Sequence, residues 1–322
     1  MSRHLPTRVT IREVGPRDGL QAERPLPAAT RAGLIDMMSG AEVPKIEAVS
    51  FVSERAVPSM AGAAEVWSLC HARPETAYSA LVPNRRGAEA AVAAGGFSSL
   101  QAFLAASEGY NTHNVGKSVE ESLADVAAVV EVARGAGLPA EVSISCSFGD
   151  PYEGEVEPSR VVEVTKRVAD LGAVGVSLGD TTGMANPSKV WDLVPMVRDA
   201  VPTVRINCHF HDSRGSALAN ALAAMEAGVE EFDSAIGGMG GSPFAPGPNG
   251  NLATEDLVAM LEGMGISTGV DVMSLFTAAR MVESMIGHRL PAHAWRADYP
   301  EHGWEALPHN PNLPGYWAEP ED

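Results

Sequence analysis

Short runs of apolar and β-branched residues alternate along this chain with longer alanine-rich stretches. VTIREV at residues 9–14 and KIEAVS at residues 45–50 are examples of the short runs. Apolar runs of roughly four to eight residues are typical of buried strands, and the longer stretches have the length of helices. The pattern therefore predicts an alternation of strands and helices from residue 9 to residue 265.

Eight strand–helix units follow one another in this pattern. We expect strands at residues 9–14, 45–50, 76–82, 99–105, 141–147, 175–180, 204–211 and 231–236. We expect helices at residues 30–40, 60–72, 85–94, 118–137, 158–171, 187–200, 215–227 and 254–263. Such units form parallel strands joined by right-handed crossovers, and eight of them close a (β/α)8 TIM barrel. An open doubly wound sheet is the alternative, but the first turn lacks the G-x-G-x-x-G motif.

The barrel domain is expected to span residues 1–290, because the composition changes in residues 291–322. This tail is rich in proline and holds Trp295, Trp304 and Trp317, three of the five tryptophans in the chain. Disordered tails are poor in aromatic residues. We therefore expect the tail to pack on the barrel or on a partner subunit, with a lid over the active site as the alternative.

The overall composition excludes several classes of function. A net charge of −18 argues against binding to nucleic acid or to an anionic membrane, although a local basic pocket for an anionic ligand stays compatible with it. The three cysteines lack C-x-x-C spacing, which fits a reducing compartment. The N-terminal residues lack the apolar run of a signal peptide, and no stretch has the length of a membrane span. We expect a soluble, cytoplasmic protein.

Polar residues collect at the predicted carboxyl ends of the strands, where barrel enzymes place their chemistry. These residues are Arg17 and Asp18 after the first strand, Glu47 in the second, Asp180 at the end of the sixth, and His209 and His211 at the end of the seventh. A glycine-rich segment follows the eighth strand and runs to Asn251, so we expect Asn251 at the same end of the barrel.

The two histidines indicate a metal site. Residues i and i+2 of a strand point to the same face, so the rings of His209 and His211 converge. Together with a carboxylate from Asp18 and an amide oxygen from Asn251, they form a ligand set that suits Mg2+ or Mn2+. Arg17, next to one ligand, is placed to hold a substrate oxyanion and stabilise an enolate.

Each of these residues also has a structural explanation. Asp18 and Asn251 are of types that form turns or cap helices. Glu47 could pair with a buried arginine or lysine, and Asp180 could cap the next helix. The two histidines could simply end a strand. A metal site would explain all of these residues at once, because they lie at one end of the barrel. The structural alternative needs a separate explanation for each residue.

Longer motifs extend this interpretation. The segments VGPRDGLQ, EAVSFVS, PYEG, SLGDT, HFHD and GNLATEDLV occur in the order and spacing of the 3-hydroxy-3-methylglutaryl-CoA (HMG-CoA) lyases, which belong to the DRE-TIM metallolyases. The chain resembles this family over roughly residues 8–290, whereas the tryptophan-rich tail has no counterpart. The resemblance implies a TIM barrel, a divalent metal, an acyl-CoA thioester substrate and a homodimer.

The resemblance also implies roles for individual residues. The family's metal ligands fall on Asp18, His209, His211 and Asn251, its catalytic arginine on Arg17, and two important carboxylates on Glu47 and Asp180. The implied reaction is a retro-Claisen cleavage. A base takes the proton of the C3 hydroxyl, the C2–C3 bond breaks, and an acid protonates the resulting acyl-CoA enolate. His209, Asp180 and Glu47 all stay candidates for the base.

The sequence departs from the family pattern at several pocket positions. Ser242 stands where the family carries a cysteine as the acid, and an alkanol is a far poorer acid than a thiol of pKa about 8.5. Ser143 replaces a tyrosine that reaches toward the substrate, while Glu54 and Ala56 replace lysine and tryptophan types. We expect a related substrate such as citramalyl-CoA, with water or another residue as the acid. Cleavage of HMG-CoA itself, assisted by serine or water, is the alternative.

Two other classes of protein are compatible with the sequence. A Claisen-type synthase of the same superfamily would run the condensation, but its loop after strand eight usually has a G-E-R-x-G-N pattern that is missing here. A non-catalytic binding barrel would explain the replaced cysteine. Loss of metal binding, with no gain of activity in a Ser242→Cys variant, would favour that second class.

Overall fold

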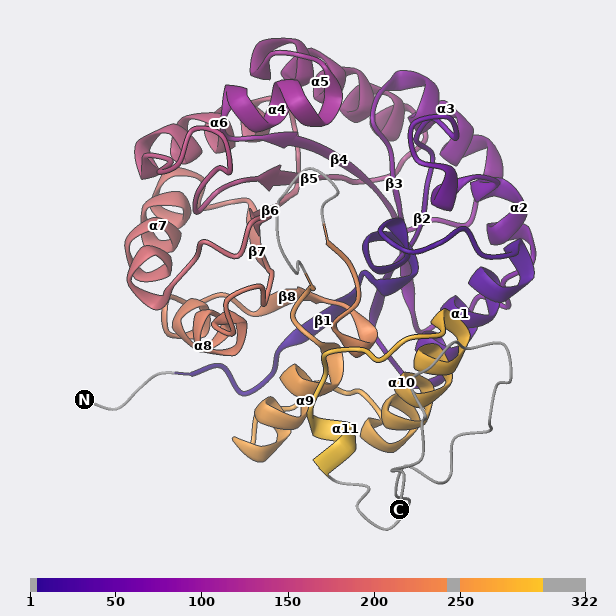
Figure 1. The fold of residues 1–322 in the computed structure, drawn as a ribbon. Coiled ribbons are helices and arrows are strands. Elements are labelled where there is room, and N and C mark those ends of the chain that lie inside the picture. The colour runs from indigo at the N-terminus through magenta and orange to yellow at the C-terminus, as the bar shows by residue number, and fades with distance from the viewer. Residues whose placement is uncertain (1–4, 242–249, 298–322) are drawn as a thin grey trace, which may run out of the picture.

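The computed structural model describes residues 5–241 and 250–297. Its strands close into a parallel barrel in the order β1 to β8, with helices outside, and Figure 1 looks along the barrel axis. Closure is made by β1 (Thr10–Glu13) and β8 (Glu231–Ser234), which pair in parallel. The predicted (β/α)8 TIM barrel is therefore confirmed.

The strands begin and end close to the predicted positions. Three of them, β2 (Lys45–Ser50), β4 (Ser99–Ala105) and β6 (Gly175–Asp180), have the predicted bounds. The other strands are shorter than predicted or shifted by a few residues. These strands are β3 (Ala77–Leu81), β5 (Ala140–Ser145), β7 (Arg205–Phe210), and β1 and β8 as given above.

Each predicted helix is present. The helices of the eight units are α1 (Ala28–Gly40), α2 (Ala63–Ser68), α3 (Arg85–Ala94), α5 (Val119–Gly135), α6 (Pro158–Asp170), α7 (Pro187–Ala200), α8 (Ala217–Glu226) and α9 (Thr254–Gly263). The structure adds α4 (Glu108–Val115), α10 (Val272–Ile286) and α11 (Ala294–Ala297), which the sequence pattern did not predict. The polar segment of α4 lacks an apolar stripe, and α10 lies beyond the eight repeated units.

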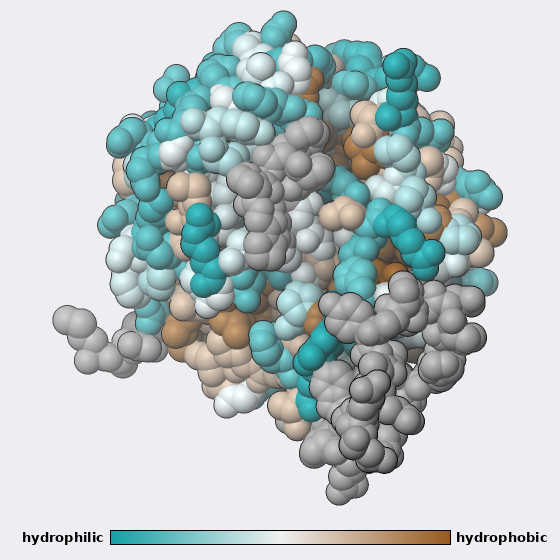
Figure 2. Space-filling view, viewed as in Figure 1, coloured by the Kyte–Doolittle hydropathy of each residue, from teal (hydrophilic) through white to brown (hydrophobic). Residues whose placement is uncertain are grey.

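Short helical turns follow three of the strands. They are η1 (Gly15–Gly19) after β1, η2 (Pro58–Met60) after β2 and η3 (Ile236–Gly238) after β8. Such turns shorten the connection at the carboxyl end of a strand and hold it close to the barrel mouth. Figure 2, in the same view, shows hydrophilic residues over most of this face, with apolar residues mainly in the hollows between helices.

The interior of the barrel is polar, in contrast to the apolar layer between strands and helices. Arg12 in β1 donates to Asp233 in β8, to Gln101 in β4 and to Glu141 in β5. Because these strands lie on different sides of the closed sheet, the Arg12 side chain must cross the barrel interior. All four side chains are buried. This network forms a polar floor beneath the barrel mouth.

The described beginning of the tail packs against the barrel. The amide of Ala292 donates to the carbonyl of Gly237, and Trp295 is buried. Residues 298–322, with Trp304 and Trp317, lie outside the described residues, so the predicted packing of the tail stays a prediction. Within residues 5–241 and 250–297, no helix is both long enough and apolar enough to cross a membrane.

Candidate active site

The turn after β1 places Arg17 and Asp18 at the barrel mouth. η1 is a π-helical turn, in which the amides of Arg17, Asp18 and Gly19 all point to the carbonyl of Val14. Single π-turns are rare and occur often at functional sites. This compact turn directs two consecutive side chains toward the barrel axis, where an extended loop would direct them to opposite sides.

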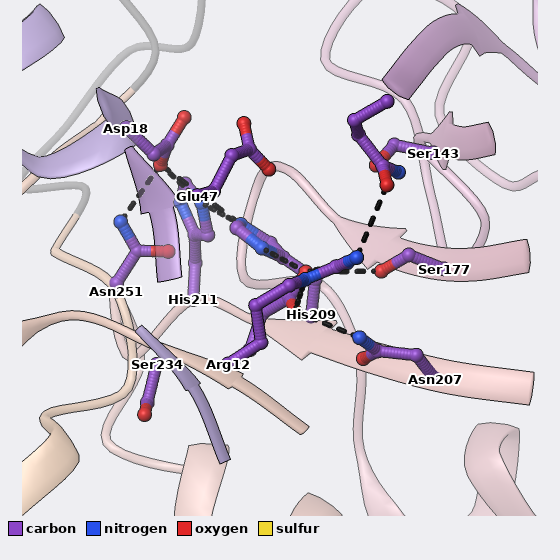
Figure 3. A network of polar contacts seen from close by, with 12 residues as sticks. Arg12, Asp18, Glu47, Ser143, Ser177, Asn207, His209, His211, Ser234 and Asn251 are labelled. Carbon is purple, nitrogen blue, oxygen red and sulfur yellow. Dashed lines mark hydrogen bonds and ion pairs between the residues drawn. The ribbon is translucent and has the colours of Figure 1, made fainter. Parts of the chain in front are cut away.

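The carboxyl end of β7 brings two imidazoles together beside Asp18. The Nε2 atoms of His209 and His211 are 3.1 Å apart, and Oδ2 of Asp18 lies 4.0 Å from the first and 3.9 Å from the second. Figure 3 shows these side chains pointing toward one another. The three residues lie close enough together to hold a metal ion. The predicted convergence of Asp18 with the histidine pair is therefore present in the structure.

Asn251 reaches the same point by a short strand-like segment. Its backbone forms an antiparallel bridge with His211, and the amide of Leu252 donates to the carbonyl of Phe210. Gly240 packs against the Asn251 side chain with a φ of +107°, and a Cβ atom there would lie 2.4 Å from Nδ2 of Asn251. A glycine at position 240 is thus needed for Asn251 to approach Asp18.

The donor atoms fit a divalent cation. Two Nε2 atoms 3.1 Å apart cannot both carry a proton between them, and burial followed by the charge of His209 lowers the pKa of His211 to about 3. Oδ1 of Asn251 is buried and has no hydrogen-bond partner among the described residues. Two imidazoles, a carboxylate and an unpartnered amide oxygen are ligands that Mg2+ or Mn2+ accepts.

Arg17 controls the charge around this site. Its Nη1 atom donates to Oδ1 of Asp18 at 2.5 Å, and its Nε atom donates to Glu47. Burial alone would raise the pKa of Asp18, but the charge of Arg17 outweighs it and the pKa falls to about 2. Asp18 is consequently ionised throughout the physiological range. The second carboxylate oxygen of Glu47 is buried and finds no partner in the described chain.

Asp180 presents a second carboxylate with a different environment. Its Oδ1 atom accepts from the amide of Ala185 at 2.9 Å, but Asn186 is the N-cap of α7, so the structural alternative in which Asp180 caps that helix is wrong. Its Oδ2 atom is buried without a described hydrogen-bond partner. Burial, partly offset by backbone hydrogen bonds, raises the pKa of Asp180 to about 7. A carboxyl group of this pKa can exchange a proton near neutral pH.

A cavity of about 590 Å³ opens beside these residues. Arg17, Ser143 and Ala56 line it, and Oγ of Ser143 accepts from Nε2 of Gln101 at 2.8 Å. A neighbouring cavity of about 900 Å³ lies between the loop after β2 and helices α2 and α3, and it includes Glu54, whose carboxylate accepts from the amide of Gly62. Ser242 lies outside the described residues.

The sequence analysis did not identify the residues beneath the metal ligands. Asp233 accepts from Nδ1 of His209 at 3.1 Å and from Arg12 with both carboxylate oxygens. The available signal was a charged residue inside each of two short predicted strands, Arg12 in TIRE and Asp233 in EFDS. Side-chain alternation points both charges to the barrel interior, but the strand pairing that joins them is not visible in the sequence.

Comparison with known proteins shows which family this chain resembles in sequence and fold. The HMGL-like family model matches residues 8–282. A mitochondrial hydroxymethylglutaryl-CoA lyase from Bos taurus is 44% identical over 286 residues, which are 88% of each chain. The structure of hydroxymethylglutaryl-CoA lyase from Pseudomonas aeruginosa superposes with a TM-score of 0.88 and 40% identity, covering 92% of this chain and 99% of that one.

A third relative was solved with bound ligands. The HMG-CoA lyase from Acinetobacter baumannii, in complex with coenzyme A and 3-methylmalate, has a TM-score of 0.86 and 36% identity, covering 91% of this chain and 95% of that one. The carboxyl transferase domain of Rhizobium etli pyruvate carboxylase shares the fold at 19% identity and a TM-score of 0.68. With the family model matching most of the barrel and relatives well above 30% identity, the chain belongs to the HMGL-like family.

Proposed function

We propose that this protein is a divalent-metal-dependent carbon–carbon lyase that cleaves a 3-hydroxy-3-methylacyl-CoA-type thioester to an acyl-CoA, such as acetyl-CoA, and a keto acid. The observation that carries the proposal is the convergence of Asp18, His209, His211 and Asn251 beside a cavity that Arg17 lines. Family membership and the coenzyme A bound by the Acinetobacter relative support an acyl-CoA substrate.

The proposed metal site would be held by the two imidazoles and by oxygens of Asp18 and Asn251. A bound Mg2+ or Mn2+ supplies Lewis-acid polarisation of substrate oxygen atoms. Arg17 is fixed by Glu47 on one side and by Asp18 on the other, so its guanidinium is pre-oriented at the edge of the cavity. Such an oriented cation stabilises negative charge that develops on a substrate oxygen during cleavage.

Proton transfer requires a group that is partly ionised near neutral pH. We propose Asp180 for this role, because the flanking residues Gly179 and Thr181 line the cavity and Oδ2 of Asp180 has no partner among the described residues; burial also raises its pKa to about 7. The C3 hydroxyl loses its proton to the base, the electron pair of the C2–C3 bond moves into the thioester enolate, and a proton returns to C2. Water or Ser242 is the proposed acid for that last step.

The substrate is proposed to differ from HMG-CoA, with citramalyl-CoA as the leading candidate. Serine at position 143, with a hydrogen bond from Gln101, gives this wall of the cavity a small and polar surface. The methyl-branched hydroxy diacid bound by the Acinetobacter relative is also short and polar. HMG-CoA itself is the second candidate, favoured by identities of 44 to 45% with lyases of that name.

The test is a substrate assay of the purified protein with Mg2+ or Mn2+ and product identification. We expect citramalyl-CoA to give acetyl-CoA and pyruvate faster than HMG-CoA gives acetyl-CoA and acetoacetate. Rapid turnover of HMG-CoA alone would reject the proposed substrate and retain the reaction. Metal binding without cleavage of any 3-hydroxyacyl-CoA would reject the lyase itself, and Ser242→Cys then serves as the control for a missing acid.

We further propose that the enzyme works as a cytoplasmic homodimer. None of the three cysteines is joined in a disulfide, which supports a reducing compartment, and relatives of this chain include an enzyme named as cytoplasmic. Sedimentation equilibrium of the full chain tests the dimer, and a monomer at micromolar concentration would reject it.

A further inference from the structure

Asp233 is the most heavily hydrogen-bonded carboxylate near the metal ligands. Its Oδ1 atom accepts from Nε of Arg12 at 2.6 Å and from Nδ2 of Asn207 at 2.7 Å. Its Oδ2 atom accepts from Nη2 of Arg12 at 2.9 Å and from Oγ of Ser177 at 3.1 Å. Nδ1 of His209 lies 3.1 Å from the same Oδ2 atom. Five contacts therefore reach one buried carboxylate.

These contacts determine which atom carries the proton between Asp233 and His209. Arginine can only donate hydrogen bonds, and it faces both oxygens of Asp233. A proton on either oxygen would point at one of the donors, so Asp233 acts purely as an acceptor. Nδ1 of His209 must consequently be the donor. The proton on Nδ1 leaves Nε2 as the lone-pair nitrogen of a neutral ring.

Nε2 is the atom that faces the other metal ligands. It lies 3.1 Å from Nε2 of His211 and 4.0 Å from Oδ2 of Asp18. Strand register makes the arrangement possible, because His209 in β7 and Asp233 in β8 are direct Cα partners and both side chains enter the barrel. The tautomer that Asp233 imposes is thus the one in which His209 can bind a cation.

We propose that Asp233 is a positioning residue that holds His209 in the metal-binding tautomer and orientation, with Arg12 and Asn207 as the supports that hold Asp233. This inference rests on the metal site of the proposed function and concerns how that site is built. The two histidines differ in this respect, since Nδ1 of His211 is buried without a hydrogen-bond partner in the described chain. Carboxylates that orient a metal-binding histidine typically raise metal affinity by about 10- to 100-fold.

The first experiment measures Mn2+ binding by electron paramagnetic resonance in Asp233→Asn and in a matched control, Glu141→Gln. Glu141 is also a largely buried partner of Arg12, at 2.9 Å, but within the described residues no hydrogen bond or ion pair joins it to His209. We expect the Asp233→Asn substitution to raise the dissociation constant for Mn2+ by about 10- to 100-fold. The Glu141→Gln protein should bind Mn2+ within about twofold of the parent chain, with circular dichroism confirming that both variants fold.

Two outcomes of this experiment would overturn the proposal. Unchanged Mn2+ affinity in Asp233→Asn would show that the carboxylate does not act on the site. Equal weakening in both variants would show a general loss of core structure, because both lose a partner of Arg12 while only one loses a partner of His209.

A second measurement needs no variant and therefore does not depend on folding of a mutant. Nitrogen-15 NMR of the histidine side chains in the unsubstituted protein, at alkaline pH, reports which ring nitrogen carries the proton. Broadening by Mn2+ identifies the rings at the site. We expect one of these rings to be protonated at Nδ1 both with and without Mg2+, whereas a proton on Nε2 of His209 would contradict the inference. Failure to bind any metal, with the Nδ1 tautomer intact, would reject the proposed metal site alone.

Discussion

Asn251 donates from Nδ2 to Oδ2 of Asp18 at 2.8 Å, although 233 positions separate the two residues in the sequence. The same amide nitrogen donates to the carbonyl of Met239, which fixes the orientation of the amide group. Oδ1 is then turned away from these acceptors and stays without a partner in the part of the chain that is described. The hydrogen bond from Asn251 thus fixes Oδ2 of Asp18 about 4 Å from the Nε2 atoms of both imidazoles.

We expect the Asp18→Ala and His211→Ala substitutions to abolish Mn2+ binding and turnover together. Each removes one of a small number of ligands whose geometry is fixed by the barrel. Isothermal titration with Mn2+ and a cleavage assay measure the two properties in the same preparations. Activity without detectable metal binding in either variant would contradict the metal site, and the exposed Arg85→Gln substitution is a control that should change neither property.

The Arg17→Met substitution should leave metal binding intact and lower kcat. The guanidinium is not a ligand, and removal of one group that stabilises an oxyanion costs about 10²- to 10³-fold in rate. Measuring kcat and the dissociation constant for Mn2+ on one preparation distinguishes a role in catalysis from a role in metal binding. Because Arg17 also lowers the pKa of Asp18, metal affinity should weaken more at acidic than at neutral pH. An unchanged kcat would remove Arg17 from the mechanism.

Loss of Arg12 should destabilise the whole barrel. An Arg12→Met substitution leaves the buried carboxylate of Asp233 without its arginine partner and removes one of the two arginine partners of Glu141. Breaking a buried ion pair by removing one member costs about 3 to 5 kcal/mol. Urea unfolding followed by circular dichroism should show this loss of stability, and a decrease below about 1 kcal/mol would mean that water reaches these carboxylates.

The stability of the fold should decrease as pH rises from about 5 to about 8. Burial raises the pKa of Glu13 from 4.5 to about 7 and that of Glu255 from 4.5 to about 8. Within this window the folded protein binds more protons than the unfolded chain, so the free energy of unfolding falls with rising pH. Both carboxylate oxygens of Glu255 accept from the amide of Gly237, a bond that a glutamine oxygen can also accept.

A Glu255→Gln variant tests this pH dependence directly. Relative to the parent protein, the variant should gain on the order of 2 kcal/mol in free energy of unfolding between pH 5 and pH 8, measured by urea unfolding at each pH. The control is the Glu163→Gln substitution at an exposed position, and its free energy of unfolding should change with pH as that of the parent protein does. Parallel curves for Glu255→Gln as well would mean that Glu255 is ionised in the folded protein.

Ser143 is expected to influence which substrate is accepted. A Ser143→Tyr substitution fills part of the cavity and removes the small acceptor for Nε2 of Gln101. If the preferred acyl chain occupies that space, KM for that substrate should rise about tenfold or more while Mn2+ affinity stays the same. Equal kinetics of the parent and the variant toward every substrate tested would place the acyl chain elsewhere in the cavity.

The repeated pattern of the sequence was sufficient to predict the barrel, because eight strand–helix units have few ways to bury their apolar faces. Strand bounds such as Ser99–Ala105 follow from runs of apolar residues between turn formers. The segment of α4 escaped prediction because its residues, such as Asn111 and His113, carry no apolar stripe. Local patterns therefore predict elements that bury a face, and they miss a helix such as α4, whose first amides donate to Asp150 and Glu153 of a neighbouring loop.

The sequence by itself determined the residue types of the site and the end of the barrel at which they lie. His209 and His211 share a face because of strand geometry, and Asp18 follows β1 directly. Only the tertiary structure decided that Asn251 donates its amide nitrogen to Asp18, and that Asp233 lies against Nδ1 of His209. Both relations depend on strand register and on backbone approach over long sequence separations, for which a single sequence holds no local signal.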